Sequence, residues 1–423
     1  MGVHMKKSKR RRFFLNSFQG SKDLLSNNNF LERAKSSPNC FTRHRKMGFV
    51  SIFEFLLHLP RGPLPAELNN FCGDKMKITK QAFSKSRNNI KSEAFREFAH
   101  VSSATVMSET KDCGDIRGYR AFSVDGTELE IPPTPENISY FGTHGGPTAC
   151  RARVSALLNI SEGIIADAEI TPLSTDERTL ANHHIEYLKK YLGQRDLMIF
   201  DRGYPSKDLI NTLESSHIKY LMRAQKSLAK EIDETPENDF NFIWTYKENH
   251  LNIRVVRVVL ETGEVENLIT NLPKEEFETE HFKELYFMRW GIESKYNTLK
   301  NKLLVEHFSG KTRLAIEQDF YATIWVANML ALAKGAADEQ IAEENAGKKL
   351  KHRYQANEKL AIKKFRDRLI QLMAEDDLKV RESLFDLLVI DIARDRSLIR
   401  PGRHFPRPND SHHRRKHRIK YVL

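Results

Sequence analysis

The chain has 423 residues, 40% of them hydrophobic, so it is long enough for two or three domains and apolar enough to bury a sizeable core. Lysine and arginine number 68 against 56 aspartates and glutamates, which gives a formal net charge of +12. This excess favours a polyanionic partner, either nucleic acid or an anionic membrane. No apolar run reaches the roughly 18 residues that a membrane span needs, which favours nucleic acid.

The N-terminus carries basic residues with no apolar stretch after them, so it does not have the form of a secretory signal. The cysteines are scattered and form no C-x-x-C pair, which argues against a zinc site. A reduced, cytosolic setting is therefore the default expectation. The four positions are Cys40, Cys72, Cys113 and Cys150.

The first hundred residues are expected to form an arm and a helical region. Residues 1–48 are polar and basic, which indicates a disordered arm; its KKSKRRR stretch, Lys6–Arg12, could contact phosphates or serve only as a solubilising tail. Residues 49–108 have a helical pattern that includes a buried helix ended by Pro60. The segment Ile78–Val101 indicates two short helices, which fits a helix-turn-helix DNA-binding module or a plain helical pair.

Strands and helices alternate from about Gly118, in the segment 109–225. GYRAFSVDGTELEI alternates like a strand and is expected to turn at Asp125-Gly126, and the apolar strand DLMIF ends at Asp201. A right-handed crossover would place the Asp201 strand parallel to an earlier one. The expected elements are strands at 118–131, 150–160 and 163–173, a helix at 176–192, a strand at 196–201, a helix at 206–217 and a strand at 219–225.

The rest of the chain is expected to change character twice. Residues 226–280 contain short strands separated by polar turns, which indicates a β-rich insertion. One amphipathic helix is predicted over 279–304, within the segment 281–335. Residues 336–423 are predicted to be helical and to end in a basic tail, SHHRRKHRIKYVL.

The amphipathic helix contains YFMRWGIESKYNTLK, in which one acid lies among bases and aromatic residues. At about 100° per residue, the polar side chains share one face and a separate apolar stripe can pack on a core. Arg289 and Glu293 could form an ordinary surface ion pair, which contributes only about 0.2–0.5 kcal/mol. The polar face consists of Tyr286, Arg289, Glu293 and Lys300.

Three carboxylates from separate elements could meet at one point. Asp125 and Asp201 lie at strand ends, and ligands of open α/β sheets collect at the carboxyl ends of strands. Together with Glu293 they would repel one another, which implies a cation, and all-oxygen ligands favour Mg²⁺ or Mn²⁺. Two such ions about 3.5–4 Å apart can activate a nucleophile and stabilise the leaving oxygen of a phosphodiester.

Each of these residues also has a structural explanation that needs no catalysis. Asp125-Gly126 could be a hairpin turn, Asp201 could belong to a strand-end turn, and Trp290 could be a core aromatic. If the carboxylates do form a site, the bases beside them have a reason to be there, because they can hold the phosphates of a nucleic acid. These bases are Arg202, Arg289 and Lys300.

The chain resembles DDE transposases of the insertion-sequence-4 type over about Gly118–Gly335. The spacing Tyr286-x2-Arg289-x3-Glu293-x6-Lys300 matches the signature of that family, and RWGIE matches its Arg-Trp-x-Ile-Glu. VDGT and FDRGY resemble the segments that carry its two aspartates, and ITNLP ahead of the helix is also similar.

This resemblance implies an α/β fold with an RNase H-like catalytic core, a mixed sheet with flanking helices, interrupted by a β-rich insertion. It implies cut-and-paste transposition of a bacterial insertion sequence by a dimer bound to double-stranded DNA, in the cytoplasm at the nucleoid. Asp125, Asp201 and Glu293 would bind the metal ions. The transposon-end phosphates would be contacted by Tyr286, Arg289 and Lys300, with Arg202 and Trp290 beside them.

Two other functions stay open at the level of sequence. One is an RNase H-like metal-dependent endonuclease that cuts without joining, and the other is a DNA-binding derivative that has lost the chemistry. Relatives in the resembled family pass through a hairpin intermediate with a flipped base stacked on an aromatic residue. Trp244 is a candidate for that aromatic, although no motif identifies it.

Overall fold

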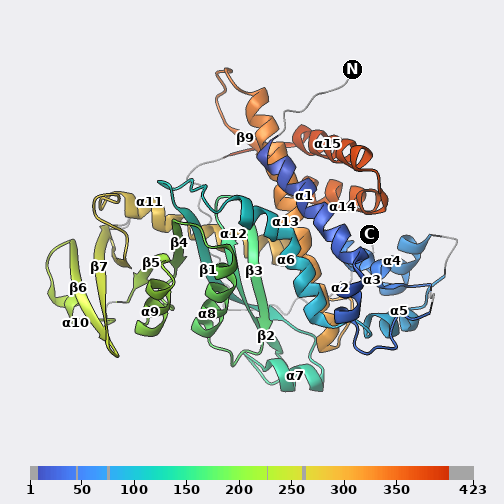
Figure 1. Cartoon of the computed structure of the whole chain (residues 1–423), viewed down its shortest axis with the longest axis horizontal. Helices are drawn as coiled ribbons and strands as arrows, with labels where there is room; N and C mark the ends of the chain where they lie inside the picture. The colour runs from blue at the N-terminus through green and yellow to red at the C-terminus, as the bar shows by residue number, and fades with distance from the viewer. Residues whose placement is uncertain (1–7, 44–45, 74–76, 226, 260–262, 400–423) are drawn as a thin grey trace. The chain divides into compact units, whose positions relative to one another are not determined.

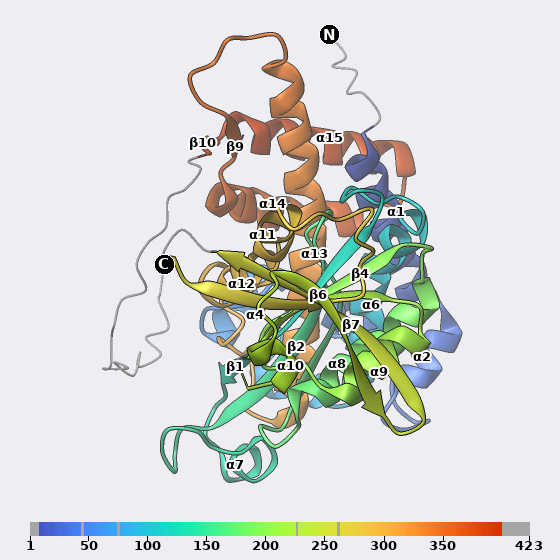
Figure 2. The same cartoon turned by 90° about the vertical axis from the view of Figure 1, so that its left-hand side faces the viewer.

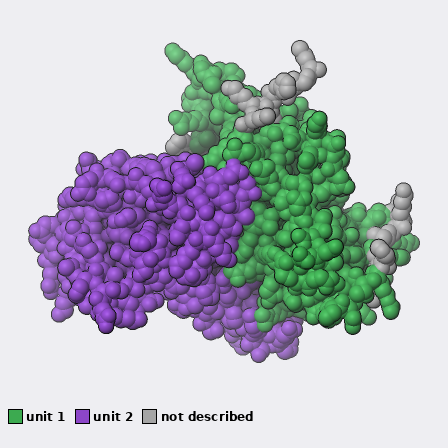
Figure 3. Space-filling view, viewed as in Figure 1, with its two compact units in different colours: residues 1–102, 299–423 green, residues 103–298 purple. Residues whose placement is uncertain are grey.

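The computed structural model describes five stretches of the chain, and these divide into two compact units (Figure 3). One unit combines residues 1–102 with residues 299–423, and the other contains residues 103–298. No helix among the described residues is long and apolar enough to cross a membrane. The described stretches are residues 8–43, 46–73, 77–225, 227–259 and 263–399.

The first unit is mainly helical and is organised around the long helix α13 (Arg313–Glu344). Trp325 in the middle of α13 is fully buried, and its indole N–H donates to Ser21 Oγ at 2.9 Å. The described elements of this unit are α1 (Lys9–Ser26), α2 (Asn28–Ala34), α3 (Phe49–Leu57), α4 (Leu64–Cys72), α5 (Lys80–Arg87), the first part of α6 (Ser92–Glu109), α13, β9 (Tyr354–Ala356), α14 (Glu358–Ala374), α15 (Leu378–Arg394) and β10 (Arg396–Leu398).

The prediction of a disordered arm over residues 1–48 is wrong for the part that forms α1 and α2. Phe13, Phe14 and Phe18 are fully buried within their unit, because α1 presents an aromatic face between its basic residues. Arg11 donates from Nε to Asp386 Oδ1 at 2.7 Å, so this base already has an acidic partner. Lys6 and Lys7 lie outside the described residues, as does the basic tail from residue 400 onward.

The second unit contains one mixed sheet of eight strands with helices on both faces (Figures 1 and 2). Its strand order is β3-β2-β1-β4-β5-β8-β7-β6. Its elements are β1 (Arg120–Glu130), α7 (Pro135–Phe141), β2 (Arg151–Asn159), β3 (Ile164–Thr171), α8 (Glu177–Leu188), a 3-10 turn (Lys189–Tyr191), β4 (Asp196–Phe200), α9 (Lys207–Ser215), β5 (Lys219–Ala224), α10 (Lys230–Glu234), β6 (Asp239–Tyr246), β7 (Asn249–Val259), β8 (Val265–Thr270), α11 (His281–Phe287) and α12 (Trp290–Asn297).

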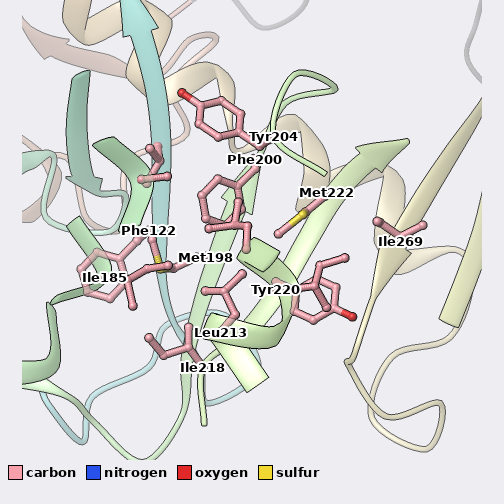
Figure 4. Close-up of a cluster of buried hydrophobic side chains, with 14 of the residues drawn as sticks. Phe122, Ile185, Met198, Phe200, Tyr204, Leu213, Ile218, Tyr220, Met222 and Ile269 are labelled. Atoms are coloured by element: carbon pink, nitrogen blue, oxygen red, sulfur yellow. The ribbon is translucent and has the colours of Figure 1, made fainter. Parts of the chain in front are cut away.

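Alternate residues of each strand supply the two faces of this sheet. Phe122, Met198 and Tyr220 point toward α8 and α9 and belong to the larger apolar cluster (Figure 4). Leu197 and Ile199 belong to a second cluster on the opposite face, where α11 contributes its own apolar side chains. The β4 strand is parallel to β1, which confirms the parallel arrangement expected for the strand that precedes Asp201.

Two local predictions from the sequence are wrong. The expected turn at Asp125-Gly126 is absent, because β1 runs without interruption from Arg120 to Glu130 and pairs antiparallel with β2 along most of that length. The single helix expected over 279–304 is interrupted between α11 and α12, and a π-helical turn follows at Thr298–Lys302.

The three strands expected between residues 226 and 280 are present as β6, β7 and β8. They do not form a sheet of their own, since β8 pairs antiparallel with β5 and thereby extends the same sheet. The segment also contains the short helix α10, which the sequence did not predict.

Candidate active site

Strand register brings Asp125 and Asp201 to neighbouring positions. The last parallel pair between β1 and β4 joins Ser123 to Ile199, and each aspartate follows two residues later. Two residues along a strand return to the same face, so both carboxylates lie on the face where Ile199 packs toward α11. The hairpin-turn interpretation of Asp125 is therefore excluded, because Asp125 lies inside β1.

Tyr286, Arg289 and Glu293 reach this pair of aspartates from the segment that joins α11 to α12. The Tyr286 hydroxyl donates to Asp201 Oδ1 at 3.0 Å. Arg289 donates from Nη2 to Glu293 Oε1 at 2.8 Å, and its Nη1 lies 3.8 Å from Asp125 Oδ2. The guanidinium therefore links two of the three acids, and the phenol holds the third.

The break between the helices coincides with these residues. Arg289 N–H donates to the Tyr286 carbonyl at 3.1 Å and Ile292 N–H to the Arg289 carbonyl at 3.2 Å, which is the tighter spacing of a 3-10 turn. The segment thus keeps the order of the predicted motif without keeping one helix axis. Only 7% of the Arg289 side chain is exposed, so the interpretation of a solvated surface pair with Glu293 is wrong.

The two aspartates differ electrostatically although their positions are equivalent. Burial raises the pKa of Asp125 to about 6, against the opposing effects of the Gly126 backbone N–H and of Arg289. Burial acts in the same direction on Asp201, but the Arg202 backbone N–H, Arg289 and the Tyr286 hydroxyl outweigh it and hold the pKa of that carboxyl below its ordinary value. Asp125 is therefore the acid with the greater need for a cationic partner.

The three acids provide a donor set that fits a hard divalent cation. Their side chains offer only carboxylate oxygens, and burial raises the pKa of Asp125 against the opposing charge of Arg289. The Arg289 guanidinium lies between Asp125 and Glu293. Within the described stretches, no group of three or more His, Cys, Asp or Glu has an arrangement that could hold a metal ion.

Residues 116–329, just over half of the chain, match the family model described as the transposase DDE domain. The chain belongs to the DDE transposase family. Members of this family are enzymes of the nuclease and transferase class that carry out DNA transposition, and they generally use divalent metal ions. The matched range includes Asp125, Asp201 and Glu293, and the match agrees with the sequence resemblance at the level of DDE transposases.

Seven chains of solved structures match this chain. One of them is the piggyBac transposase in a synaptic complex with hairpin DNA, determined by cryo-electron microscopy, with 8% sequence identity and a TM-score of 0.46. The alignment covers 92% of this transposase and 87% of the other chain. No match was found among curated protein sequences.

The aromatic residues beside Arg289 are exposed. Trp290 is 44% exposed and Phe287 is 55% exposed, and their rings stack with centroids 5.4 Å apart and planes 19° from parallel. The interpretation of Trp290 as a core aromatic is therefore wrong. Trp244 differs, because it packs partly buried against the larger apolar cluster with Lys207 Nζ 5.2 Å from its ring centroid.

The predicted bases are placed differently from one another. Arg202 is exposed directly after Asp201. Lys300 lies in the π-helical turn and belongs to the first compact unit. Arg223, which the sequence motifs did not reveal, is on β5 and lowers the pKa of Asp201 by its charge. The register of β4 and β5 could have identified it, since Phe200 pairs with Met222 and the next residues are Asp201 and Arg223.

Two further residues near Asp125, Tyr296 and Glu177, gave no sequence signal. Tyr296 donates its hydroxyl to the Asp125 backbone carbonyl at 2.6 Å, and it follows Glu293 by three residues. Glu177, at the start of α8, is paired with Arg153 at 2.6 Å. Its Oε1 lies 2.8 Å from where a Cβ of residue 126 would be, so Gly126 leaves room for this fourth carboxylate.

Proposed function

We propose that this protein is a transposase of the insertion-sequence-4 type, which cleaves DNA at the ends of its element and joins those ends to target DNA. Asp125, Asp201 and Glu293 act as its catalytic carboxylates. The observation that carries the proposal is their convergence: two aspartates at equivalent positions of adjacent parallel strands, with Glu293 tied to Asp125 through Arg289.

The same carboxylates would hold two divalent ions, either Mg²⁺ or Mn²⁺, as we inferred from the sequence. When bound, such ions supply activation of an attacking hydroxyl and stabilisation of the leaving oxygen. Arg289 would then exchange carboxylate contacts for phosphate contacts, since a guanidinium binds both by the same paired hydrogen bonds. We take the catalytic core to be RNase H-like, as the resemblance implies.

Residues around the carboxylates would contact DNA. Tyr286 and Arg289 lie at the acids, Arg202 is exposed beside Asp201, and Lys300 follows them in the family signature. Trp290, with its exposed face, can stack on a base, as aromatic side chains do in complexes with single-stranded nucleic acids. The substrate would be double-stranded DNA carrying terminal inverted repeats, bound by a homodimer in a bacterial cytoplasm.

Cleavage and joining assays on the full chain test this function. The substrate is a duplex that carries the inverted repeats flanking the gene, here called end DNA, together with a supercoiled target plasmid. We expect Mg²⁺-dependent cleavage and strand transfer by the unaltered protein. We expect that Asp125→Asn, Asp201→Asn and Glu293→Gln each abolish cleavage yet bind end DNA, because an amide is a poor metal ligand.

The outcomes separate the competing functions. Cleavage without strand transfer would identify an endonuclease, and binding without either reaction would identify a silent derivative. Full cleavage by any one of the three variants would remove that residue from the site. A control is Glu214→Gln on α9, which neutralises a carboxylate beside Tyr220, away from the three acids, and should cleave normally.

A further inference from the structure

Tyr296 lies where it can control the position of a catalytic carboxylate. It follows Glu293 by three residues on α12, about one helical turn, and is 7% exposed. Its hydroxyl donates to the backbone carbonyl of Asp125 at 2.6 Å. Burial, reinforced by the charge of Asp125, raises the pKa of this phenol well above its ordinary value, so the hydroxyl stays protonated and remains a donor.

The same carbonyl is approached from the opposite face of the sheet by a chain of buried polar side chains. Ser155 Oγ lies 3.5 Å from the Asp125 carbonyl oxygen, at the long limit of a hydrogen bond. His184 on α8 places Nε2 3.0 Å from Ser155 Oγ and Nδ1 2.8 Å from Asp167 Oδ2. All three side chains are essentially inaccessible, with Asp167 the most exposed at 1%.

Such a chain is unusual at this place, because α8 otherwise meets the sheet through apolar residues such as Ala181 and Ile185. A buried polar group lowers stability unless its hydrogen bonds are satisfied, whereas an apolar residue would fill the space without that requirement. Ser155 pairs with Gly126 across β1 and β2, so the chain supports the strand immediately beside Asp125.

We propose that Tyr296 is a positioning residue that fixes the backbone of Asp125 relative to Glu293, and that the Ser155–His184–Asp167 chain supports the same stretch of β1 from the other face. Because Glu293 and Tyr296 share one helix, a single hydrogen bond to the Asp125 carbonyl ties the two acids together. The Lys295 ammonium adds a second attachment of α12, to the Gly163 carbonyl at 2.7 Å. The inference rests on the proposed function, in which these carboxylates hold the metal ions.

The decisive variant is Tyr296→Phe, which removes one oxygen and keeps the ring. The matched control is Tyr220→Phe, which removes the hydroxyl of another buried tyrosine of the same unit, one that lies beside Glu214. For the full chain we measure Mn²⁺ affinity by titration calorimetry, the Mg²⁺ dependence of cleavage, end-DNA affinity and melting temperature. All assays run well below the melting temperature of every variant.

We expect Tyr296→Phe to weaken Mn²⁺ binding by roughly 10- to 100-fold, the usual effect of losing a group that orients a metal ligand. Cleavage should fall at low Mg²⁺ and recover in part at high Mg²⁺, while the affinity for end DNA stays unchanged. Ser155→Ala should have a smaller effect. The double variant should lose more than the product of the two single effects, because both hydroxyls support one carbonyl.

Mn²⁺ affinity and Mg²⁺ dependence of Tyr296→Phe equal to those of Tyr220→Phe would overturn the inference. The role of the buried chain would be overturned if Ser155→Ala behaved like Tyr220→Phe and the double variant behaved like Tyr296→Phe. Failure of the proposed function has a different signature: the unaltered protein would not cleave and join end DNA. Failure of the metal-ligand assignment would appear as Mn²⁺ binding and cleavage by Asp125→Asn equal to those of the unaltered protein.

Discussion

Replacement of Arg289 by methionine tests whether its buried charge stabilises the neighbouring carboxylates. Methionine keeps much of the side-chain volume and removes the charge. The Arg289 side chain is 7% exposed, and its guanidinium contacts Glu293 at 2.8 Å and lies 3.8 Å from Asp125. Breaking a buried ion pair costs about 3–5 kcal/mol, and loss of a charge-assisted hydrogen bond costs about 1.5–3 kcal/mol.

The expected loss of stability is near the lower of these ranges. The carboxylates left behind keep some water, since the Glu293 side chain is 32% exposed and that of Asp125 is 22% exposed. We therefore expect a cost of about 2–3 kcal/mol at about pH 8, intermediate between exposed and fully buried pairs. For a unit of this size, that cost corresponds to a decrease in Tm of roughly 4–12 °C.

The cost should also depend on pH. Arg289 lowers the pKa of both Asp125 and Asp201, so its removal raises both values in the folded state. The stabilisation that Arg289 provides is therefore present above these pKa values, and it is lost as the pH falls through them. For Asp125 the relevant value in the unaltered protein is about 6, so the difference in Tm should shrink between about pH 8 and about pH 5.

The assay is thermal unfolding of both proteins across this pH range without divalent metal, followed by single-turnover cleavage of end DNA at about pH 8. Cleavage by Arg289→Met should fall by orders of magnitude, and Arg289→Lys should restore it only in part, because a point charge replaces a paired donor. A pH-independent loss below about 1 kcal/mol with normal cleavage is what an ordinary surface pair gives. That result would refute both the buried position of the guanidinium and its role in cleavage.

Three further outcomes follow from the structure. Because burial raises the pKa of Asp125 to about 6, cleavage at limiting Mg²⁺ should decline as the pH falls through that value. A higher Mg²⁺ concentration should lower the pH at which cleavage is half-maximal, because metal and proton compete for the carboxylate. A half-maximal pH that does not depend on Mg²⁺ would contradict this competition. Trp290→Ala removes an exposed ring that stacks on Phe287, so it should change Tm little and weaken end-DNA binding by about 1–3 kcal/mol; unchanged binding would exclude base stacking there. Arg11→Ala should lower Tm and leave the salt dependence of DNA affinity unchanged, because Arg11 is paired with Asp386. Deletion of residues 409–423 should instead flatten the slope of log affinity against log salt by about 0.9 for each phosphate that the protein no longer neutralises.

Local sequence patterns were sufficient to predict the order of elements from β2 to β5 in the second unit. The strands at β2, β3, β4 and β5 and the helices α8 and α9 were all expected close to their observed bounds, because their hydrophobic periodicity is regular and their ends carry turn or cap residues. The sequence also showed which three acids were candidates and how Tyr286, Arg289 and Glu293 are spaced.

Local chemistry is misleading where distant segments compete with it. Asp125-Gly126 has the composition of a hairpin turn, but pairing with β2 keeps it extended. The segment from Lys9 to Ala34 has the bases of a disordered arm. It folds because Phe14 stacks on Phe385, with ring centroids 4.0 Å apart, in a helix more than 350 residues away along the chain.

The sequence by itself indicated the three acids, Tyr286 and Arg289 of the candidate site, since their residue types and spacing can be read along the chain. Only the tertiary structure decided their state: that Arg289 is buried between two acids, that Asp125 is harder to ionise than Asp201, and that Tyr296 holds the Asp125 carbonyl. Burial and hydrogen bonding depend on which elements pack against one another. The relevant contacts join β1, β2, α8 and α12, whose proximity no local pattern of residues encodes.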